Sequence, residues 1–136
     1  MQELIYQLQV QALNIFYHSA HWRCKGVNFY QDHLLFARLY QGIDDEIDNI
    51  VELLIGFYDD DSFVAPQLFN EKTQKYIPVG KNDARENLAS ALETENKLLS
   101  YISTINSDIS VGVYNQIASI ADYHARNVYL IKQALK

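Results

Sequence analysis

Two histidines and two carboxylates lie close together in this sequence and form a candidate metal site. They are His21, His33, Asp48 and Glu52. Imidazole nitrogens and carboxylate oxygens together make a mixed ligand set that suits iron, with zinc or manganese as possible substitutes. The sequence therefore predicts a site that binds a divalent transition-metal ion.

The spacing of these residues indicates where such a site would lie. If residues 30–57 form one helix that turns by 100° per residue, then His33, Asp48 and Glu52 share one side of it. The apolar stripe of the same helix points roughly 120° away from them. That stripe consists of Phe36, Leu39, Ile43, Ile47, Ile50 and Leu54. The candidate ligands are therefore expected to face away from the core of their own chain.

The flank of the predicted helix that carries the ligands also carries apolar side chains. These are Ala37, Val51 and Ile55. A helix with two apolar faces usually packs against two neighbours. We therefore predict that the metal site lies at an interface between subunits.

Length and composition favour one helical domain. The chain has 136 residues, which is typical of a single domain spanning 1–136. Five glycines and two prolines in a chain that is 49% hydrophobic favour long helices. The net charge is −6, and this charge disfavours nonspecific binding to DNA and favours the attraction of cations.

The N-terminus and the cysteine content indicate a cytoplasmic location. The first ten residues, MQELIYQLQV, lack the basic region of a secretory signal. Cys24 is the only cysteine, so no disulfide within the chain can form. No apolar run has the length needed to cross a membrane.

Apolar periodicity predicts four helices and one long connection. The helices span about 2–24, 30–57, 83–104 and 109–134. Gly26 is a plausible terminator of the first helix. Expected N-caps are Asn82 or Asp83 for the third helix and Ser107 or Asp108 for the fourth.

The connection at residues 58–82 is too long for a simple turn. In a four-helix bundle, a connection of this length joins two helical hairpins as a crossover. We expect a short helix around residues 66–72, and the apolar side chains of this region indicate that it packs against the bundle. Those side chains are Phe63, Val64, Leu68, Phe69, Tyr76 and Ile77.

A di-iron centre inside the bundle is not expected. Proteins with such a centre carry Glu-x-x-His on two helices. None of the glutamates here is followed by histidine at the third position; they are Glu3, Glu46, Glu52, Glu71, Glu86, Glu93 and Glu95. His124, on the last predicted helix, is interpreted as a structural or surface residue.

A different motif lies between residues 14 and 57. His21-Trp22, Lys25-Gly26, Asn28-Phe29 and His33 are followed by Tyr40 and then by Asp48-x-x-x-Glu52. This order and spacing resemble the signature of the mini-ferritins, the family of DNA-protection-during-starvation (Dps) proteins. The rest of the chain is similar to that family mainly in the order and length of its helices.

The resemblance implies an all-α, ferritin-like four-helix bundle that assembles into a shell of twelve subunits. In such a shell, an intersubunit ferroxidase centre oxidises Fe(II) with hydrogen peroxide or dioxygen, and the ferric iron is stored inside. The resemblance assigns His21 and His33 to one subunit and Asp48 and Glu52 to its two-fold mate, as metal ligands and catalytic residues. Trp22, His18 and Asp44 would surround these ligands.

Position 37 departs from the family pattern. The family usually carries an aspartate four residues after the second histidine, and this chain carries Ala37, which cannot bind a metal. One metal position should be weaker, because affinity depends on the number and charge of the ligands. An alternative is therefore a noncatalytic shell or assembly protein with a degraded metal site.

DNA compaction is a third hypothesis, and the charge disfavours it. Some family members bind DNA through a basic terminal tail. The first basic residue here is Arg23, and Lys136 alone ends the chain. Without such a tail, we expect weak or no DNA binding.

Overall fold

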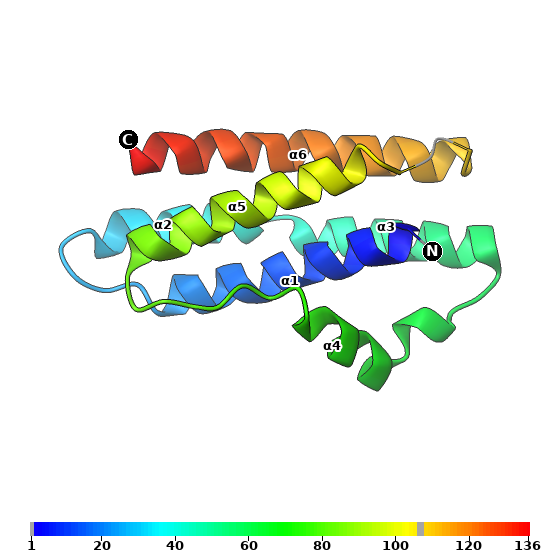
Figure 1. Cartoon of the computed structure of the whole chain (residues 1–136), viewed down its shortest axis with the longest axis horizontal. Helices are drawn as coiled ribbons and strands as arrows, with labels where there is room; N and C mark the ends of the chain where they lie inside the picture. Colours follow the sequence, from blue (N-terminus) through cyan, green and yellow to red (C-terminus); the bar gives the residue numbers. More distant parts are fainter. Residues whose placement is uncertain (1, 106–107) are drawn as a thin grey trace.

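The computed structural model describes residues 2–105 and 108–136, with side chains from residue 7 onward, and this part of the chain is all helical (Figure 1). Its helices are α1 (Gln2–Trp22), α2 (Phe29–Tyr40), α3 (Ile43–Tyr58), a 3₁₀ turn η1 (Ser62–Val64), α4 (Pro66–Gln74), α5 (Ala84–Ile102) and α6 (Val111–Leu135). The expected all-α class is confirmed for these residues.

The long helices lie side by side along the long axis of the molecule (Figure 1). α1 runs antiparallel to α2 and α3, which follow one another nearly in line. α5 runs in the direction of α2 and α3, and α6 returns. α1 contacts α2, α3 and α5, while α6 contacts α3 and α5. α3 ends at the end of the bundle where α5 also ends and α6 begins, whereas α5 starts at the opposite end (Figure 1). Residues 59–83 therefore run back along the bundle between α3 and α5.

The core is built from apolar side chains of all the long helices. The fully buried members include Leu13, Tyr17, Phe36, Leu39, Ile43, Ile50, Leu54, Leu88, Leu98, Ile117 and Ile131. The stripe predicted for residues 36–54 is therefore buried, apart from Ile47, which is half-buried. Ile15 of α1 is 40% exposed, because Leu13 and Tyr17, each two residues away, face inward.

The single helix predicted for residues 30–57 is wrong: the chain forms two helices there. Gly42 adopts a φ of +85°, a left-handed conformation that ends one helix before the next begins. Side chains of α6 bind the carbonyls freed at this break. The Tyr123 hydroxyl donates to the Gln41 carbonyl, and Asn127 Nδ2 donates to the Leu39 carbonyl at 3.2 Å. The break is therefore held by the neighbouring helix.

The connection between α3 and α5 packs against the bundle as the sequence predicted. The expected short helix exists as α4, with Pro66 at its first turn, where a missing N–H costs nothing. Phe63 of η1 is buried, and α4 contacts α1. Leu68 is partly exposed, so only some of the apolar residues of this region face inward.

The helix ends agree with the predicted caps in part. The side chain of Asp83 accepts a hydrogen bond from Arg85 N at 3.1 Å, as expected for an N-cap of α5. The cap of α6 is Ser110, which accepts from Val113 N at 3.2 Å, and not Asp108. Ser107 lies outside the described residues. Gly26 has a φ of +93°, consistent with its predicted place after α1.

No helix in the described ranges is both long and apolar enough to span a lipid bilayer.

Candidate metal centre

His21 and His33 lie face to face where α1 ends and α2 begins. Their ring centroids are 3.7 Å apart with planes inclined by 16°. His21 Nδ1 lies 2.7 Å from the carbonyl oxygen of His33, and His33 Nδ1 lies 2.9 Å from that of His21. Each ring therefore holds the backbone of the other residue, and both side chains are half-buried.

This reciprocal bonding fixes which ring nitrogens remain for a ligand. A carbonyl oxygen only accepts hydrogen bonds, so Nδ1 of each ring must carry the proton. In a neutral imidazole, Nε2 then has a free lone pair, and Nε2 is the atom that can bind a metal. Histidine ligands usually have their second nitrogen bonded in this way, because the bond orients the ring. The geometry thus presents two prepared nitrogen donors.

Aromatic rings surround the histidine pair. Phe29 stacks on His33 at 4.9 Å, and Tyr40 meets the His21 ring edge-on at 5.5 Å. His18 stacks on Tyr40 at 3.8 Å and lies 5.5 Å from Trp22. Trp22 is 73% exposed, so it lies at the surface of the single chain. Tyr40 therefore links His18 to His21, and Trp22 contacts His18, whereas Asp44, the third residue expected around the ligands, lies on α3.

Asp48 and Glu52 lie one turn apart on α3, and both are exposed. Among the described residues, neither carboxylate has an ion-pair or hydrogen-bond partner. They border a pocket of about 380 Å³, whose other lining residues are Gln7, Ile47, Val51, Val64 and Phe69. Two unpaired carboxylates at this spacing can bind one cation together.

A single chain does not bring the histidines and the carboxylates together. His33 and Asp48 lie on different helices, α2 and α3, which follow one another nearly in line (Figure 1). Within the described residues, no group of three or more His, Cys, Asp or Glu side chains could hold a metal ion. The four predicted ligands thus form two separate groups, here called half-sites: the histidine pair and the carboxylate pair.

Two further residues near these half-sites have defined places. Ala37 is half-buried on α2 and contributes only a methyl group. Asp44, at the start of α3, accepts a hydrogen bond from Asn14 Nδ2 of α1 at 3.0 Å. Asp44 is therefore already hydrogen-bonded within the bundle.

Cys24, the one cysteine of the chain, is buried. Its Sγ lies 3.2 Å from the Ala20 carbonyl oxygen, and burial together with the charge of Asp32 raises its pKa.

A buried polar network in the middle of the bundle was not predicted. His124 lies between two carboxylates, with Nδ1 at 2.7 Å from Glu95 Oε2 and Nε2 at 2.9 Å from Glu46 Oε2. The Tyr17 hydroxyl donates to Glu95 Oε1 at 2.6 Å, and Asn127 Nδ2 donates to the same oxygen at 3.2 Å. His124 and Glu95 are fully buried. The network thus takes side chains from α1, α3, α5 and α6.

The charges in this network control one another's protonation. Burial alone would lower the pKa of His124, but Glu95 and Glu46 outweigh it and raise that pKa to about 10. Burial raises the pKa of Glu46, and the hydrogen bond from His124 partly offsets the rise. Burial and the neighbouring Glu95 raise the pKa of Tyr17 well above its usual value. The network therefore holds an imidazolium between two acids.

The sequence does contain a signal for this network. Glu46 follows Ile43 by three residues and precedes Ile50 by four, so it stands within the apolar stripe of its helix. Glu95 and His124 occupy equivalent gaps in the stripes of their own helices. Charged residues at core positions are rarely buried unless they are paired. Treating His124 as a structural residue was right, whereas a surface position for it was wrong.

Gln7 is a second residue that sequence reasoning missed. It is fully buried beside Asp48 and Glu52, and both ends of its amide are without a partner among the described residues. Burying an unpaired amide is unfavourable. The carboxylate half-site therefore has an unsatisfied polar group next to it.

Comparisons of this chain with protein-family models, with curated proteins and with solved structures give no match. Residue chemistry and geometry are therefore the grounds for assigning a function.

Proposed function

We propose that this protein binds Fe(II) between two subunits, oxidises it with hydrogen peroxide or dioxygen, and stores the ferric product. The observation that carries this proposal is the stacked pair of His21 and His33. Each Nδ1 is bonded to a backbone carbonyl, so each Nε2 is left to a ligand. A pair that served only packing would not need both rings oriented in this way.

A second copy of the chain would complete the site. In a two-fold dimer, each surface patch meets the same patch on its mate, so the histidines of one subunit can face Asp48 and Glu52 of the other. Exposed apolar side chains flank both half-sites, which favours contact with a partner. Near the histidines they are Trp22, Phe29, Tyr30 and Leu34, and near the carboxylates they are Leu53, Phe57 and Tyr58.

The chemistry follows from this ligand set. Two nitrogen and two oxygen donors hold Fe(II) and leave coordination positions open for the oxidant. Two Fe(II) ions give one electron each to hydrogen peroxide, which takes up two protons and leaves as two water molecules. Because both electrons are delivered, no hydroxyl radical is released, which would protect the cell against peroxide damage.

The arrangement of the helices supports a ferritin-like architecture. The connection at residues 59–83 returns along the bundle, so that α5 runs parallel to α2 and α3 (Figure 1). Ferritin-like folds have one long crossover of this kind. We therefore propose a mini-ferritin of the Dps type, a shell of twelve subunits, in the cytoplasm. The net charge of −6 favours iron over DNA as the cargo.

A second candidate function is a noncatalytic shell or assembly protein that has lost part of its metal site. Ala37 favours it, since a methyl group stands where the family carries a carboxylate. The buried network around His124 also gives the bundle a hydrogen-bonded polar core, which such a protein would keep. This protein would assemble in the same way and leave Fe(II) unoxidised.

Aerobic oxidation of Fe(II), followed by ferric absorbance, tests the proposal. We expect the full chain to oxidise Fe(II) faster than buffer, and the His33→Ala variant to fall to the buffer rate while the particle stays intact. The matched control is Gln31→Ala, which removes an exposed polar side chain from the helix that carries His33. A parental rate in the His33→Ala variant would contradict the site. An intact parent particle without any oxidation would favour the second candidate.

A further inference from the structure

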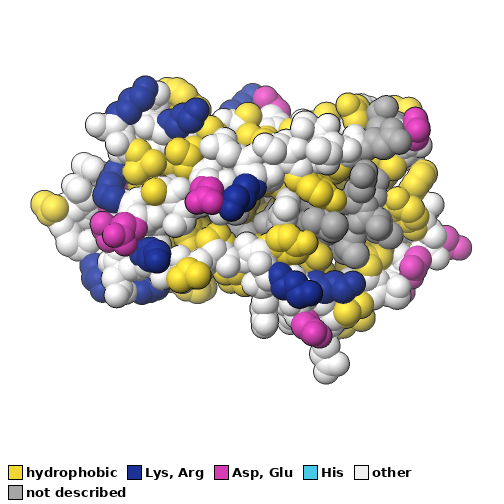
Figure 2. All heavy atoms as spheres, viewed as in Figure 1, with side chains coloured by type: hydrophobic (Ala, Val, Ile, Leu, Met, Phe, Trp, Pro, Cys, Tyr) yellow, Lys and Arg dark blue, Asp and Glu magenta, His cyan; other side chains and the backbone are white. Residues whose placement is uncertain are grey.

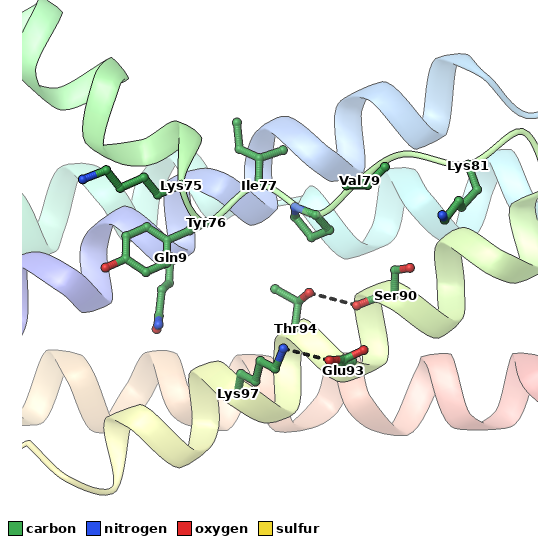
Figure 3. Close-up of a pocket in the computed structure, with 11 residues that line it drawn as sticks. Gln9, Lys75, Tyr76, Ile77, Val79, Lys81, Ser90, Glu93, Thr94 and Lys97 are labelled. Atoms are coloured by element: carbon green, nitrogen blue, oxygen red, sulfur yellow. Dashed lines mark hydrogen bonds and ion pairs between the residues drawn. The ribbon is translucent and has the colours of Figure 1, made fainter.

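A pocket on another part of the molecule has the character of a ligand site. It lies where residues 75–81, here called the roof segment, pass over α5 and α1, and its volume is about 420 Å³ (Figure 3). No histidine among the described residues is visible on this face in Figure 2, so the pocket is separate from the His21–His33 pair. Its size is in the range of pockets that hold small molecules.

The local structure holds the roof segment in place. Lys81 N donates to Asn87 Oδ1 at 2.8 Å, and Asn87 Nδ2 donates back to the Lys81 carbonyl at 3.1 Å. Asn87 is buried on α5, so this reciprocal pair ties one end of the segment to the bundle. At the other end, Tyr76 N donates to the Thr73 carbonyl of α4 at 3.0 Å. Pro78 stiffens the backbone between these ends.

The charge of the pocket is opposite to that of the whole chain. Three of the 11 basic residues line it, namely Lys75, Lys81 and Lys97, together with one acid, Glu93. Lys97 Nζ is 2.7 Å from Glu93 Oε1, whereas Lys75 and Lys81 have no ion-pair partner among the described residues. Figure 2 shows basic side chains spread across this face with apolar ones between them. Two unpaired ammonium groups therefore border one cavity.

The pocket also offers an apolar wall and polar groups for orientation. Tyr76, Ile77, Pro78 and Val79 of the roof segment form the wall, opposite Ser90 and Thr94 of α5. Figure 3 shows Lys81 turned toward α5 and Lys97 beside Glu93. Gln9 of α1 lines the same pocket, but its Oε1 is buried and is not exposed to the cavity.

We infer that this pocket binds a small organic anion: a molecule with a carboxylate or phosphate group and an apolar body that packs against the roof segment. Lys81, which turns toward α5 in Figure 3, supplies a charge-assisted hydrogen bond to the anionic group. Tyr76 and Pro78 contact the body. This inference is independent of the proposed iron chemistry.

Titration calorimetry on the full chain at low ionic strength tests the inference. The probes are adenosine monophosphate, adenosine, inorganic phosphate and phenylacetate. Adenosine lacks the anionic group, inorganic phosphate lacks the body, and phenylacetate carries a carboxylate in place of the phosphate. We expect measurable binding of adenosine monophosphate or phenylacetate, and much weaker binding of adenosine and of inorganic phosphate. Equal affinity for inorganic phosphate and adenosine monophosphate would overturn the predicted role of the apolar wall.

Variants place the binding at this pocket. Lys81→Gln should weaken the affinity about tenfold, in keeping with the loss of one charge-assisted hydrogen bond. The control is Lys132→Gln, which removes an exposed positive charge from α6, outside the pocket. Equal losses in Lys81→Gln and Lys132→Gln, or binding of none of the four probes, would overturn the inference.

Discussion

At the scale of single residues, the proposed iron site depends on how two imidazoles are held. His21 and His33 each donate Nδ1–H to the other's backbone carbonyl. This arrangement decides the tautomer and points Nε2 away from the backbone. The histidines and acids themselves could be predicted from sequence, because their types and spacing carry the motif. Their mutual backbone bonds could not, because they depend on how α1 meets α2.

Ala37→Asp should strengthen metal binding. The substitution restores a charged oxygen ligand at the half-buried position four residues after His33. We expect about a tenfold gain in affinity for Zn(II) or a second bound metal per site, because affinity rises with ligand number and charge. Titration with Zn(II), with metal counted per subunit, measures the gain. Asp45→Asn, an exposed substitution elsewhere, should change nothing, and an unchanged titration for Ala37→Asp would show that position 37 does not face the site.

His124 should make the unfolding free energy depend on pH above neutrality. Its pKa is about 10 in the folded chain, and that of an unfolded histidine is about 6.5. Since the folded pKa is the higher one, the stabilisation is complete below about pH 6.5 and is lost as pH rises toward 10. Urea unfolding between pH 7 and 9.5 should therefore show falling stability, with a flatter profile in His124→Gln.

The control for this pH dependence is Lys132→Gln, which removes a positive charge from the exposed side of the same helix. It should keep the parental slope. Equal slopes for the parent and His124→Gln would show that the imidazolium between Glu46 and Glu95 is not the origin of the effect. His124→Ala should lower stability by about 3–5 kcal/mol, since it leaves two buried carboxylates without their partner.

At the scale of elements, the break between α2 and α3 is the main difference from the sequence prediction. Periodicity predicted one helix for residues 30–57, because the apolar stripe continues through Leu39 and Ile43 without a gap. Gly42 interrupts that helix, and Tyr123 and Asn127 of α6 bind the carbonyls at the break. A helical stripe identifies which residues face the core, but it does not report a local turn held by a distant helix. The position of His33 relative to Asp48 therefore could not be derived from one continuous helix.

Gly42→Ala should destabilise the fold, because a left-handed backbone costs a residue with a Cβ about 1–2 kcal/mol. The added methyl group itself has room, since the nearest atom is Tyr123 Cε2 at 3.9 Å. Gly56→Ala is the matched control within α3: no atom lies within 4 Å of its added Cβ. Alanine should stabilise that helix by about 1 kcal/mol. Urea unfolding of both variants checks the pair, and an equal gain in both would mean that residue 42 does not need its left-handed conformation.

At the scale of the whole molecule, the charged side chains inside the bundle are paired, whereas those of the proposed site on its surface are not. The Glu46–His124–Glu95 network satisfies charge inside the bundle, while Asp48 and Glu52 remain unpaired outside. Exposed aromatic and aliphatic side chains surround both half-sites. These features are what a second subunit would cover. Sequence periodicity predicted a second apolar flank at Ala37, Val51 and Ile55. These side chains are half-buried, and Val51 and Ile55 pack against the chain's own core, so one chain alone does not reveal an interface.

Val51→Lys should dissociate the proposed assembly. Val51 is half-buried beside Asp48 and Glu52, and a lysine there would have its charge desolvated at the proposed interface, at a cost of several kcal/mol. Sedimentation velocity should show a shift to smaller particles. Val111→Lys, at a 77% exposed position on α6, is the control that should keep the parental profile. A parental particle in Val51→Lys would mean that this flank faces solvent.

Joint assembly of two inactive variants tests most directly whether two subunits share one iron site. His33→Ala and Asp48→Ala chains are each expected to be inactive, and they are mixed in equal amounts, dissociated and reassembled. In a shared site, the histidines of an Asp48→Ala chain meet the carboxylates of a His33→Ala chain, so random pairing restores about a quarter of the sites. We therefore expect the mixture to recover about a quarter of the parental rate of Fe(II) oxidation. A mixture that assembles fully and stays as inactive as its components would contradict a site shared between two subunits.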